Sequence, residues 1–282
     1  MIADEFRAMG TFVSVTAPTQ AGIDATQRWF ETVEQVCSRF RADSDLTSVN
    51  DALAQRVRLS PLLCEVLAAA DKLRLLTGGL VDPAVGGDVI RWGYDRTYEE
   101  VEDCAAPSEA RCTNRSWSIR DGWLVRGVDL RLDLGGVAKG WAADRAVETG
   151  LASIVSAGGD VRSANPDAII RILDPDEEVV GTVPLGRGAL ATSSVARRRW
   201  RTGGQTANHI IDPRNGSPAV GPIVSATVVA RTAVEAEAGA KAMLLHGTDG
   251  LAWVAAQPWL DGGLAVWADG SVFATANLEV AV

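Results

Sequence analysis

Short apolar strands and helices follow one another along this chain without a repeating order. Alternating apolar residues predict a strand over 5–17, and apolar residues at helical spacing predict a helix over 22–37. A capping Ser60 before Pro61 predicts a second helix, which runs to about Leu76. Because there is no regular βαβ alternation, this order favours an α+β fold over a doubly wound sheet.

Turn and capping signals mark three further elements. Asp121-Gly122, flanked by short apolar runs, predicts a β-hairpin. A helix is expected over about 138–148, and Thr232 opens another, in which Glu235 completes a capping box. Three segments are predicted as irregular loops or surface excursions: 38–50, 80–94 and 98–116.

Length and charge exclude several classes of protein. The 282 residues include 27 Lys and Arg against 36 Asp and Glu, a net charge of −9. The length predicts a single domain over 1–282, with two fused lobes as the other arrangement considered. The acidic balance argues against nucleic-acid or anionic-membrane binding, which needs clustered Lys and Arg. With no run of about 18 apolar residues, no membrane span is predicted.

The cysteines, the histidines and the N-terminus argue against a zinc centre and indicate the cellular compartment. The four cysteines lack the CxxC spacing of a metal site and there are only two histidines, which argues against a zinc centre. The N-terminus has no basic stretch followed by an apolar one, so we expect a cytoplasmic protein with reduced thiols. A disulfide between Cys104 and Cys112 stays open.

Two glycine-rich turns are candidate phosphate sites. Between Asp133 and Lys139 a strand ends in two glycines and a helix begins, so free backbone N–H groups can hold phosphate while Lys139 adds a cation. The alternative is an ordinary strand–helix turn with a surface lysine. Gly158-Gly159, after an apolar run, lets a ligand approach the backbone, although paired glycines also suit any tight turn.

Two side-chain pairs are candidates for chemistry. His209 lies three residues before Asp212 in a loop near the basic run 197–199, an arrangement suited to deprotonating a hydroxyl beside a polyphosphate. The alternative is a packed histidine with Asp212 starting a turn. Glu237 and Lys241 share a helix face at i and i+4. A plain surface salt bridge between them would contribute little, but their flanking residues are nearly all Ala, Gly and apolar, which favours a nearly buried pair.

The segment Gly186-Arg-Gly188-Ala-Leu-Ala191 fits a loose GxGxxA dinucleotide pattern. That pattern requires a helix next. The residues that follow have no 3.6-residue apolar stripe, so we reject it.

Taken in order, the candidate segments resemble the ApbE family, the FAD:protein FMN transferases. The resemblance runs from about residue 8 to residue 245, and seven pieces in a fixed order are hard to obtain by chance. The matching residues are Ala8-Met9-Gly10-Thr11; Ser38-Arg39-Phe40 through Ser44 to Asn50; Thr77-Gly-Gly-Leu80-Val81-Asp82-Pro83; Asp133-Leu-Gly-Gly136-Val-Ala-Lys139-Gly140; Ala157-Gly158-Gly159-Asp160; Ala191-Thr-Ser-Ser194; and His209-Ile210-Ile-Asp212-Pro-Arg-Asn-Gly216.

The resemblance implies a T-fold-like α+β structure of mixed, largely antiparallel sheets packed with helices, with the site in a cleft between two lobes. It implies an enzyme that binds FAD, with Mg²⁺ on the diphosphate. This enzyme transfers FMN to a Ser or Thr hydroxyl of a target flavoprotein and releases AMP. The expected FAD contacts are Met9, Phe40, Leu80, Val81, Asp82, Asp133, Lys139 and Ile210, with Gly158 and Gly159 beside them. The candidate catalytic residues are His209 as the base, Asp212 and Lys241.

The implied metal site departs from the family pattern. A backbone carbonyl of the first turn, here Gly136, should lie beside an Asp and a Thr on a late helix, but here Glu237 replaces the Asp and Lys241 the Thr. Mg²⁺ needs compact oxygen ligands, and an ammonium group is not a ligand. Gly136 and Glu237 are the candidate metal residues, and three outcomes stay open. In the first, Lys241 places its charge where the metal usually lies. In the second, the Lys241 side chain turns away and Glu237 binds a metal ion more weakly. In the third, the protein binds flavin but does not transfer it. The first is favoured.

Two other functions stay open. A hydrolase would split FAD into FMN and AMP with water as the acceptor, and the sequence does not separate this from transfer. A flavin-binding protein without catalysis would also account for the altered helix.

Overall fold

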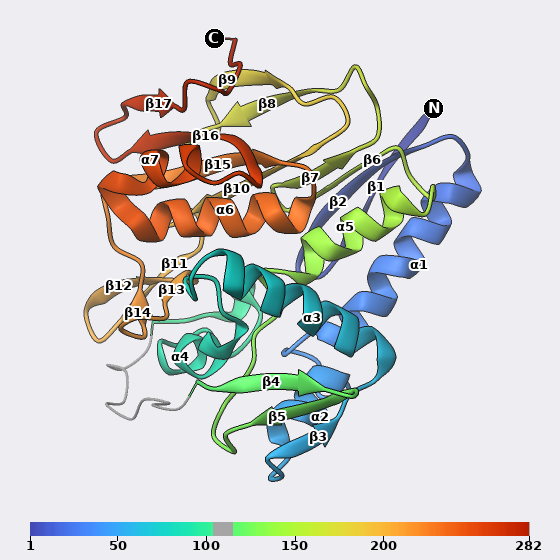
Figure 1. Ribbon diagram of the computed structural model, residues 1–282, viewed down its shortest axis with the longest axis vertical. Coiled ribbons are helices and arrows are strands. Elements are labelled where there is room, and N and C mark those ends of the chain that lie inside the picture. The colour runs from blue at the N-terminus through green and yellow to red at the C-terminus, as the bar shows by residue number, and fades with distance from the viewer. Residues whose placement is uncertain (104–114, 282) are drawn as a thin grey trace. The chain divides into compact units, whose positions relative to one another are not determined.

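The computed structural model describes residues 1–103 and 115–281 (Figure 1). The chain forms two compact units. The first comprises Met1–Phe30, Lys139–Arg197 and the chain from Val220 onward, and the second comprises Glu31–Ala138 and Arg198–Ala219. Helix α1 (Gln20–Cys37) begins in the first unit and ends in the second.

An eight-stranded sheet forms the centre of the first unit, in the order β1-β2-β6-β7-β10-β15-β16-β17. Every neighbouring pair is antiparallel. The pairing of β2 with β6, in which Val13 lies opposite Ala157, joins segments far apart in the sequence. The strands are β1 (Ile2–Ala8), β2 (Thr11–Ala17), β6 (Ile154–Ala157), β7 (Asp160–Ser163), β10 (Ala189–Ser194), β15 (Ile223–Ala230), β16 (Leu260–Trp267) and β17 (Val272–Ala274).

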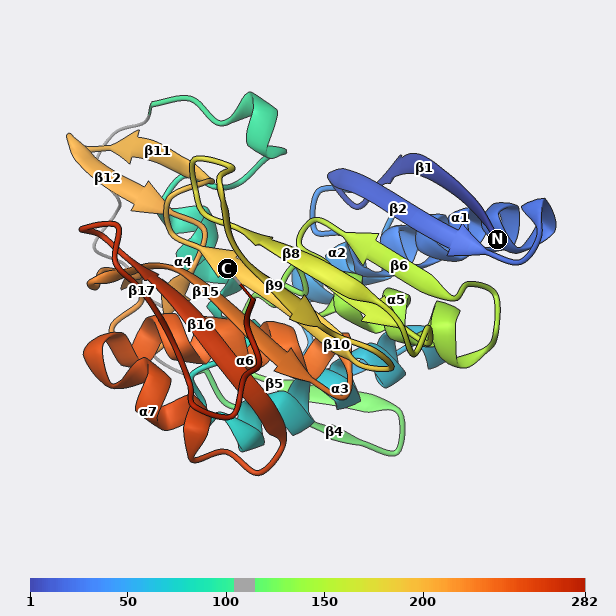
Figure 2. The same ribbon diagram turned by 90° about the horizontal axis from the view of Figure 1, so that it is seen from above.

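Strands β7, β10, β15 and β16 of this sheet are covered on both faces (Figure 2). A two-stranded ribbon, β8 (Ile169–Leu173) with β9 (Val179–Pro184), covers one face. On the other lie α6 (Ala233–His246), η3 (Gly247–Asp249) and α7 (Gly250–Ala255). The core under the ribbon consists of Val161, Ile172, Val183, Leu185, Leu190, Val229, Leu264 and Val266.

Helix α6 packs closely against β10 and β15 because its residues are small. A Cβ at Gly239 would lie 2.9 Å from Val228 Cγ1 and 3.0 Å from Leu260 Cδ1, so a larger residue would push the helix away from the sheet. The hydroxyl of Thr232 accepts a hydrogen bond from the Glu235 N–H at 3.4 Å, which confirms the predicted start of the helix.

Asp144, on helix α5 (Ala138–Glu148), joins α5 to the first turn of α6. Its two carboxylate oxygens accept hydrogen bonds from Ala233 N–H at 2.8 Å and Val234 N–H at 3.1 Å, and Arg162 Nε lies 3.3 Å from Oδ1. Burial raises the pKa of Asp144 to about 6, although these hydrogen bonds and Arg162 act against the rise. The carboxylate therefore holds two helices of the first unit together.

The second unit is built from short elements. Its sheets are β3-β5-β4, β11-β12 and β13-β14. The strands are β3 (Arg56–Arg58), β4 (Trp117–Arg120), β5 (Trp123–Arg126), β11 (Arg199–Thr202), β12 (Gln205–Asn208), β13 (Ile211–Asp212) and β14 (Ser217–Pro218). The helices that belong wholly to this unit are α2 (Asp45–Asp51), α3 (Pro61–Leu76), η1 (Pro83–Val85), α4 (Gly86–Arg91) and η2 (Tyr98–Glu100). One of its cores consists of Val89, Trp92, Tyr94, Trp200, Ala207 and Ile211.

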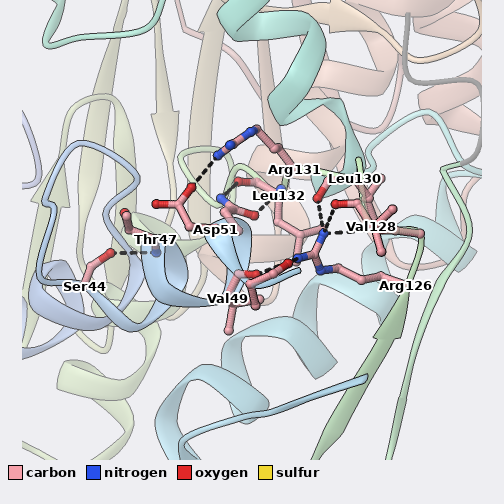
Figure 3. A network of polar contacts seen from close by, with 12 residues as sticks. Ser44, Thr47, Val49, Asp51, Arg126, Val128, Leu130, Arg131 and Leu132 are labelled. Carbon is pink, nitrogen blue, oxygen red and sulfur yellow. Dashed lines mark hydrogen bonds and ion pairs between the residues drawn. The ribbon is translucent and has the colours of Figure 1, made fainter. Parts of the chain in front are cut away.

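A buried arginine joins the end of α2 to the segment that follows β5, as Figure 3 shows. The guanidinium of Arg126 donates hydrogen bonds to five backbone carbonyls at 2.7–3.1 Å. Two belong to Val49 and Ala52, at the end of α2, and the others to Gly127, Val128 and Leu130. Burial lowers the pKa of Arg126, and the neighbouring Arg131 adds to the effect.

Several predicted elements are confirmed. The α+β class with largely antiparallel sheets holds, α3 begins after the capping Ser60, and β4 and β5 form the hairpin around Asp121-Gly122. Residues 189–194 are strand β10 and not a helix, so the GxGxxA segment lacks the context of a dinucleotide site. None of the helices in residues 1–103 and 115–281 has the length and hydropathy needed to span a membrane.

Other predictions are wrong. Residues 5–17 are not one strand, because Met9 and Gly10 turn with φ of 53° and 68° and separate β1 from β2. The predicted loop 38–50 contains most of helix α2, which Ser44 caps, and the loop 80–94 contains η1 and α4. The Cys104–Cys112 pairing and most of the excursion 98–116 lie outside the described residues.

Candidate functional site

Two of the chain's three lysines lie beside two carboxylates in the first unit. Lys241 Nζ is 2.6 Å from Glu237 Oε1, and Lys139 Nζ is 3.6 Å from the same oxygen. Lys139 Nζ also lies 3.7 Å from Asp160 Oδ2. We call these four residues the lysine–carboxylate cluster.

Three elements position the cluster. Lys139 is the second residue of α5, and Asp160 is the first residue of β7. Glu237 and Lys241 stand one turn apart on α6, the spacing at which helical side chains meet. The predicted near-burial of the Glu237–Lys241 pair is confirmed, and the pair does not stand alone.

The turn before Asp160 requires its glycines. Gly158 and Gly159 have φ of 61° and 103°, in the region that favours glycine. A Cβ at Gly158 would lie 2.8 Å from Thr11 Oγ1, and one at Gly159 would lie 3.3 Å from Thr192 O. The two glycines therefore set the position of the Asp160 carboxylate.

Within the cluster, the carboxylates are more deeply buried than the lysines. The side chains of Asp160 and Glu237 are each 4% exposed, against 14% for Lys139 and 17% for Lys241. Among the described residues, Asp160 Oδ2 and Glu237 Oε2 have no hydrogen-bond partner. The ammonium groups are thus carried by the more accessible side chains, an arrangement suited to an anionic ligand.

Burial and charge act together on the two carboxyl groups. Burial, reinforced by the neighbouring Glu237, raises the pKa of Asp160 against the opposing effect of the two lysines. Burial also acts to raise the pKa of Glu237, but Lys139 and Lys241 outweigh it and lower this pKa. Glu237 is therefore the ionised carboxylate around which both ammonium groups gather.

The cluster does not fit Mg²⁺. An ammonium group cannot be a metal ligand, and two of them lie within 3.7 Å of the carboxylate oxygens. Within residues 1–103 and 115–281, no group of three or more His, Cys, Asp or Glu side chains is placed to hold a metal ion. Gly136, the other candidate metal residue, lies in the turn before α5 and belongs to the second unit.

In the second unit, Asp133 is held on both oxygens. Arg39 Nε donates to Oδ2 at 2.6 Å, and the Gly135 N–H donates to Oδ1 at 2.6 Å. The Arg39 guanidinium carbon lies 4.0 Å from the ring centroid of Phe40 and 4.7 Å from that of Tyr94. One arginine therefore joins two predicted FAD contacts, Phe40 and Asp133. Arg39 was not among the site residues predicted from the sequence, although it lies inside the Ser-Arg-Phe segment.

Hydrogen bonds to Trp117 and Thr77 hold the predicted FAD contacts at 80–82 in place. Asp82 Oδ1 accepts a hydrogen bond from Trp117 Nε1 at 3.0 Å. The Val81 N–H donates to Thr77 Oγ1 at 3.1 Å, and both Leu80 and Val81 are buried. Trp117 lies on β4, 35 residues after Asp82, so no local sequence pattern predicts this contact.

The loop after β12 holds the histidine predicted as the base. His209 is half-buried, and Ile210 is buried, with its N–H donating to Asn208 Oδ1 at 3.0 Å. Asp212 binds the Arg214 guanidinium at 2.7 Å. Burial acts to raise the pKa of Asp212, but the hydrogen bonds from Arg214 outweigh it and lower the pKa. This pairing favours an orienting part for Asp212 over proton uptake.

The structure brings three of the predicted site residues into one cluster, and the others are placed within one unit or the other. Lys139, Glu237 and Lys241 meet in one cluster, together with Asp160, which ended a predicted motif but was not among the candidate site residues. Met9 lies in the β1–β2 turn of the same unit. Gly158 and Gly159 also belong to this first unit. The remaining candidates belong to the second unit: Phe40, Leu80, Val81, Asp82, Asp133, Gly136, His209, Ile210 and Asp212.

The antiparallel eight-stranded sheet packed against helices makes this an α+β protein. Its site is a largely buried group of lysines and carboxylates. Residues 9–264 match the model of the ApbE family. This match covers most of the chain, so the protein belongs to the ApbE family.

Relatives and solved structures agree with the family. A protein of Rhodobacter capsulatus named FAD:protein FMN transferase is 34% identical over an alignment of 257 positions that covers 84% of this chain and 49% of that protein. The chain thus spans about half the length of this relative. A protein of the same name from Escherichia coli is 26% identical over an alignment of 277 positions that covers 87% of this chain and 78% of that protein.

The fold is shared with solved members of the family. The crystal structure of the ApbE protein of Thermotoga maritima is 26% identical, with a TM-score of 0.86 over 98% of this chain and 97% of that one. The flavin transferase ApbE of Vibrio cholerae is 24% identical, with a TM-score of 0.79 and the same coverage, and shows the same fold.

Proposed function

We propose that this protein transfers FMN from FAD to a Ser or Thr hydroxyl of a target flavoprotein and releases AMP. The observation that carries the proposal is the lysine–carboxylate cluster, in which two lysines are held by two more deeply buried carboxylates in a member of the ApbE family. Ammonium groups are point charges suited to phosphate, and FAD offers a diphosphate. The names of the relatives from R. capsulatus and E. coli support the same reaction.

The transfer step exchanges one phosphorus–oxygen bond for another. The acceptor hydroxyl oxygen forms a bond to the phosphorus of the FMN half, and the bond from that phosphorus to the bridging oxygen breaks. AMP leaves with the bridging oxygen and its electron pair, while the hydroxyl proton goes to a base. Catalysis of such a step consists chiefly of positioning and charge neutralisation, which is the part proposed for Lys139 and Lys241.

His209 is the proposed base. Histidine accepts protons near neutral pH, and this one lies half-buried beside the buried Ile210. The Asp212 carboxylate already accepts hydrogen bonds from the Arg214 guanidinium. We therefore assign Asp212 the role of orienting the loop that carries His209.

The proposed flavin and adenine contacts differ in chemistry. The Phe40 ring, on a residue 40% exposed and backed by Arg39, offers a surface for stacking. Asp82 and Asp133 offer carboxylate acceptors for ring N–H groups. The further contacts proposed are Met9, Leu80, Val81, Gly158, Gly159 and Ile210.

Mg²⁺ is not assigned to Gly136 and Glu237, because Glu237 Oε1 already faces two ammonium groups. We also propose a cytoplasmic location. Cys37 and Cys64 are free cysteines, which suits a reducing compartment.

Incubation of the purified protein with FAD and a candidate acceptor flavoprotein tests the function. Transfer predicts that the acceptor gains the mass of FMN less one water, with one AMP released for each modified acceptor. AMP without a mass gain identifies a hydrolase that uses water as the acceptor. Neither product, with FAD still bound, identifies a flavin-binding protein and overturns the transfer.

A further inference from the structure

We propose that Lys139 and Lys241 are a built-in pair of cations that carries the diphosphate charge of FAD without a divalent metal. Glu237 and Asp160 are then positioning residues that hold the two ammonium groups. This inference rests on the proposed function, since it states how the same site holds its substrate. It makes the protein a member of its family whose substrate binding is independent of metal.

The geometry of Glu237 is the first argument. Its Oε1 lies 2.6 Å from Lys241 Nζ and 3.6 Å from Lys139 Nζ, so ammonium groups from two different helices converge on one carboxylate oxygen. A helix-surface ion pair would involve only the i and i+4 partners on α6. The approach of Lys139 from α5 shows that two cations, and not one, are gathered there.

The count of charges is the second argument. The cluster holds two ammonium groups and two carboxyl groups, joined by three ammonium–carboxylate distances of 2.6, 3.6 and 3.7 Å. A divalent cation bound by the same carboxylates would bring two further positive charges next to the two lysines, and such repulsion is strong where water is excluded. A diphosphate brings negative charge instead and complements the lysines.

The donors of Lys241 are the third argument. An ammonium group has three N–H donors, and the described residues occupy one donor of Lys241, through Glu237. The Lys241 side chain is 17% exposed while that of Glu237 is 4% exposed, so the remaining donors lie on the more accessible partner. Phosphate oxygens of FAD are acceptors suited to these donors.

Metal binding by the unaltered protein gives the first test, which needs neither FAD nor an activity assay. Mn²⁺ is titrated into the protein while its free ion is followed by electron paramagnetic resonance. The inference predicts no saturable uptake. One equivalent of bound Mn²⁺ that disappears in Glu237→Gln would show that the carboxylates hold a metal and would overturn the inference.

FAD binding gives the second test. Calorimetry in excess EDTA and again in millimolar Mg²⁺ is expected to give dissociation constants that agree within about twofold, far less than the tenfold change that about 1.4 kcal/mol would produce. FAD uptake that requires Mg²⁺ overturns the inference and leaves the proposed function standing. No uptake of FAD under either condition overturns the proposed function itself.

Variants of Lys241 supply the third test. Lys241→Met keeps the length of the side chain and removes its charge, and we expect FAD affinity in EDTA to fall about 10- to 100-fold, the loss of one charge-assisted hydrogen bond. Lys241→Arg, which keeps the charge, should retain more of the affinity than Lys241→Met. Lys72→Met is the matched control, because Lys72 is the third lysine and lies exposed on α3.

Lys241→Met also leaves a buried Glu237 without its partner, which can impair folding. The double variant Glu237→Gln/Lys241→Met removes both charges and keeps the measurement possible. Its circular dichroism should match that of the unaltered protein while its FAD affinity stays reduced. Unchanged FAD affinity in a folded Lys241→Met or double variant overturns the inference.

Discussion

Asn50 and Leu132 are joined by two hydrogen bonds: Asn50 Nδ2 donates to Leu132 O at 2.9 Å, and the Leu132 N–H donates to Asn50 Oδ1 at 2.8 Å. Asn50 lies buried on α2, and Leu132 comes directly before Asp133. The side-chain amide therefore satisfies both backbone groups of Leu132, as a neighbouring strand would, directly before the Asp133 turn.

Replacement of this amide tests its role. Asn50→Asp keeps the size of the side chain but gives an ionised group that only accepts hydrogen bonds, so Leu132 O loses its donor. We expect the free energy of unfolding in urea to fall by about 1–3 kcal/mol. Asn215→Asp is the control, because Asn215 is exposed and its side-chain oxygen accepts a hydrogen bond from the Ser217 N–H, a role that a carboxylate keeps. Equal stability of the two variants would contradict a role for the amide.

Arg126 should be a strong determinant of the stability of the second unit. Its planar guanidinium reaches five carbonyls, and the single ammonium group of Arg126→Lys cannot satisfy the same set. We expect a loss of at least about 2 kcal/mol in unfolding free energy. Arg120→Lys, at an exposed position of β4, should change it by less than about 0.5 kcal/mol. A loss no greater in Arg126→Lys than in this control would show that the network adds nothing to stability.

The raised pKa of Asp144 predicts a particular pH dependence. The folded protein keeps this proton up to about pH 6, whereas an unfolded Asp releases it near pH 3.9. The folded state therefore binds more protons in between, and this group lowers the free energy of unfolding as pH rises from about 4 to about 6. Asp144→Asn should lack this contribution, so its stability relative to the unaltered protein should improve by up to about 1.4 kcal/mol per pH unit.

Denaturant unfolding at a series of pH values measures this difference. Asp261→Asn serves as the control, because Asp261 is exposed on β16. A constant difference between Asp144→Asn and the unaltered protein from pH 4 to pH 6 would contradict the raised pKa.

His209→Ala tests the proposed base. Loss of general-base catalysis should reduce the rate of FMN transfer about 10²- to 10⁴-fold while FAD affinity stays close to that of the unaltered protein. His246→Ala is the matched control, because the ring of His246 stacks on Trp253 at 4.9 Å in the first unit. Near-normal transfer by His209→Ala removes His209 from the base role, and a parallel loss of FAD affinity would make it a binding residue.

Local signals predicted local structure well. The cap at Thr232, the Ser60-Pro61 helix start and the Asp121-Gly122 hairpin each depend on a few adjacent residues, and each is present. The turn at Met9 was missed because a methionine at positive φ has no sequence signal of its own. Helix α2 was missed because only a few of its residues are buried in a mainly polar segment.

Contacts between distant segments were not readable from the sequence. Glu237 and Lys241 were predicted to pair because four residues separate them on one helix. The approach of Lys139 and Asp160 to the same pair depends on how α5 and β7 pack against α6, and no local pattern records that packing. The same holds for Arg39 and Asp133, which are 94 residues apart.

Asp144 has a consequence for the charges that stand near it in the fold. Since it fastens α5 to the first turn of α6, the helix that carries Lys139 cannot shift freely against the helix that carries Glu237 and Lys241. The spacing of the two cations is then set before any ligand arrives. A preorganised site loses little conformational entropy when an anion binds. Part of its affinity therefore comes from the folding of the protein, which has already ordered the two lysines.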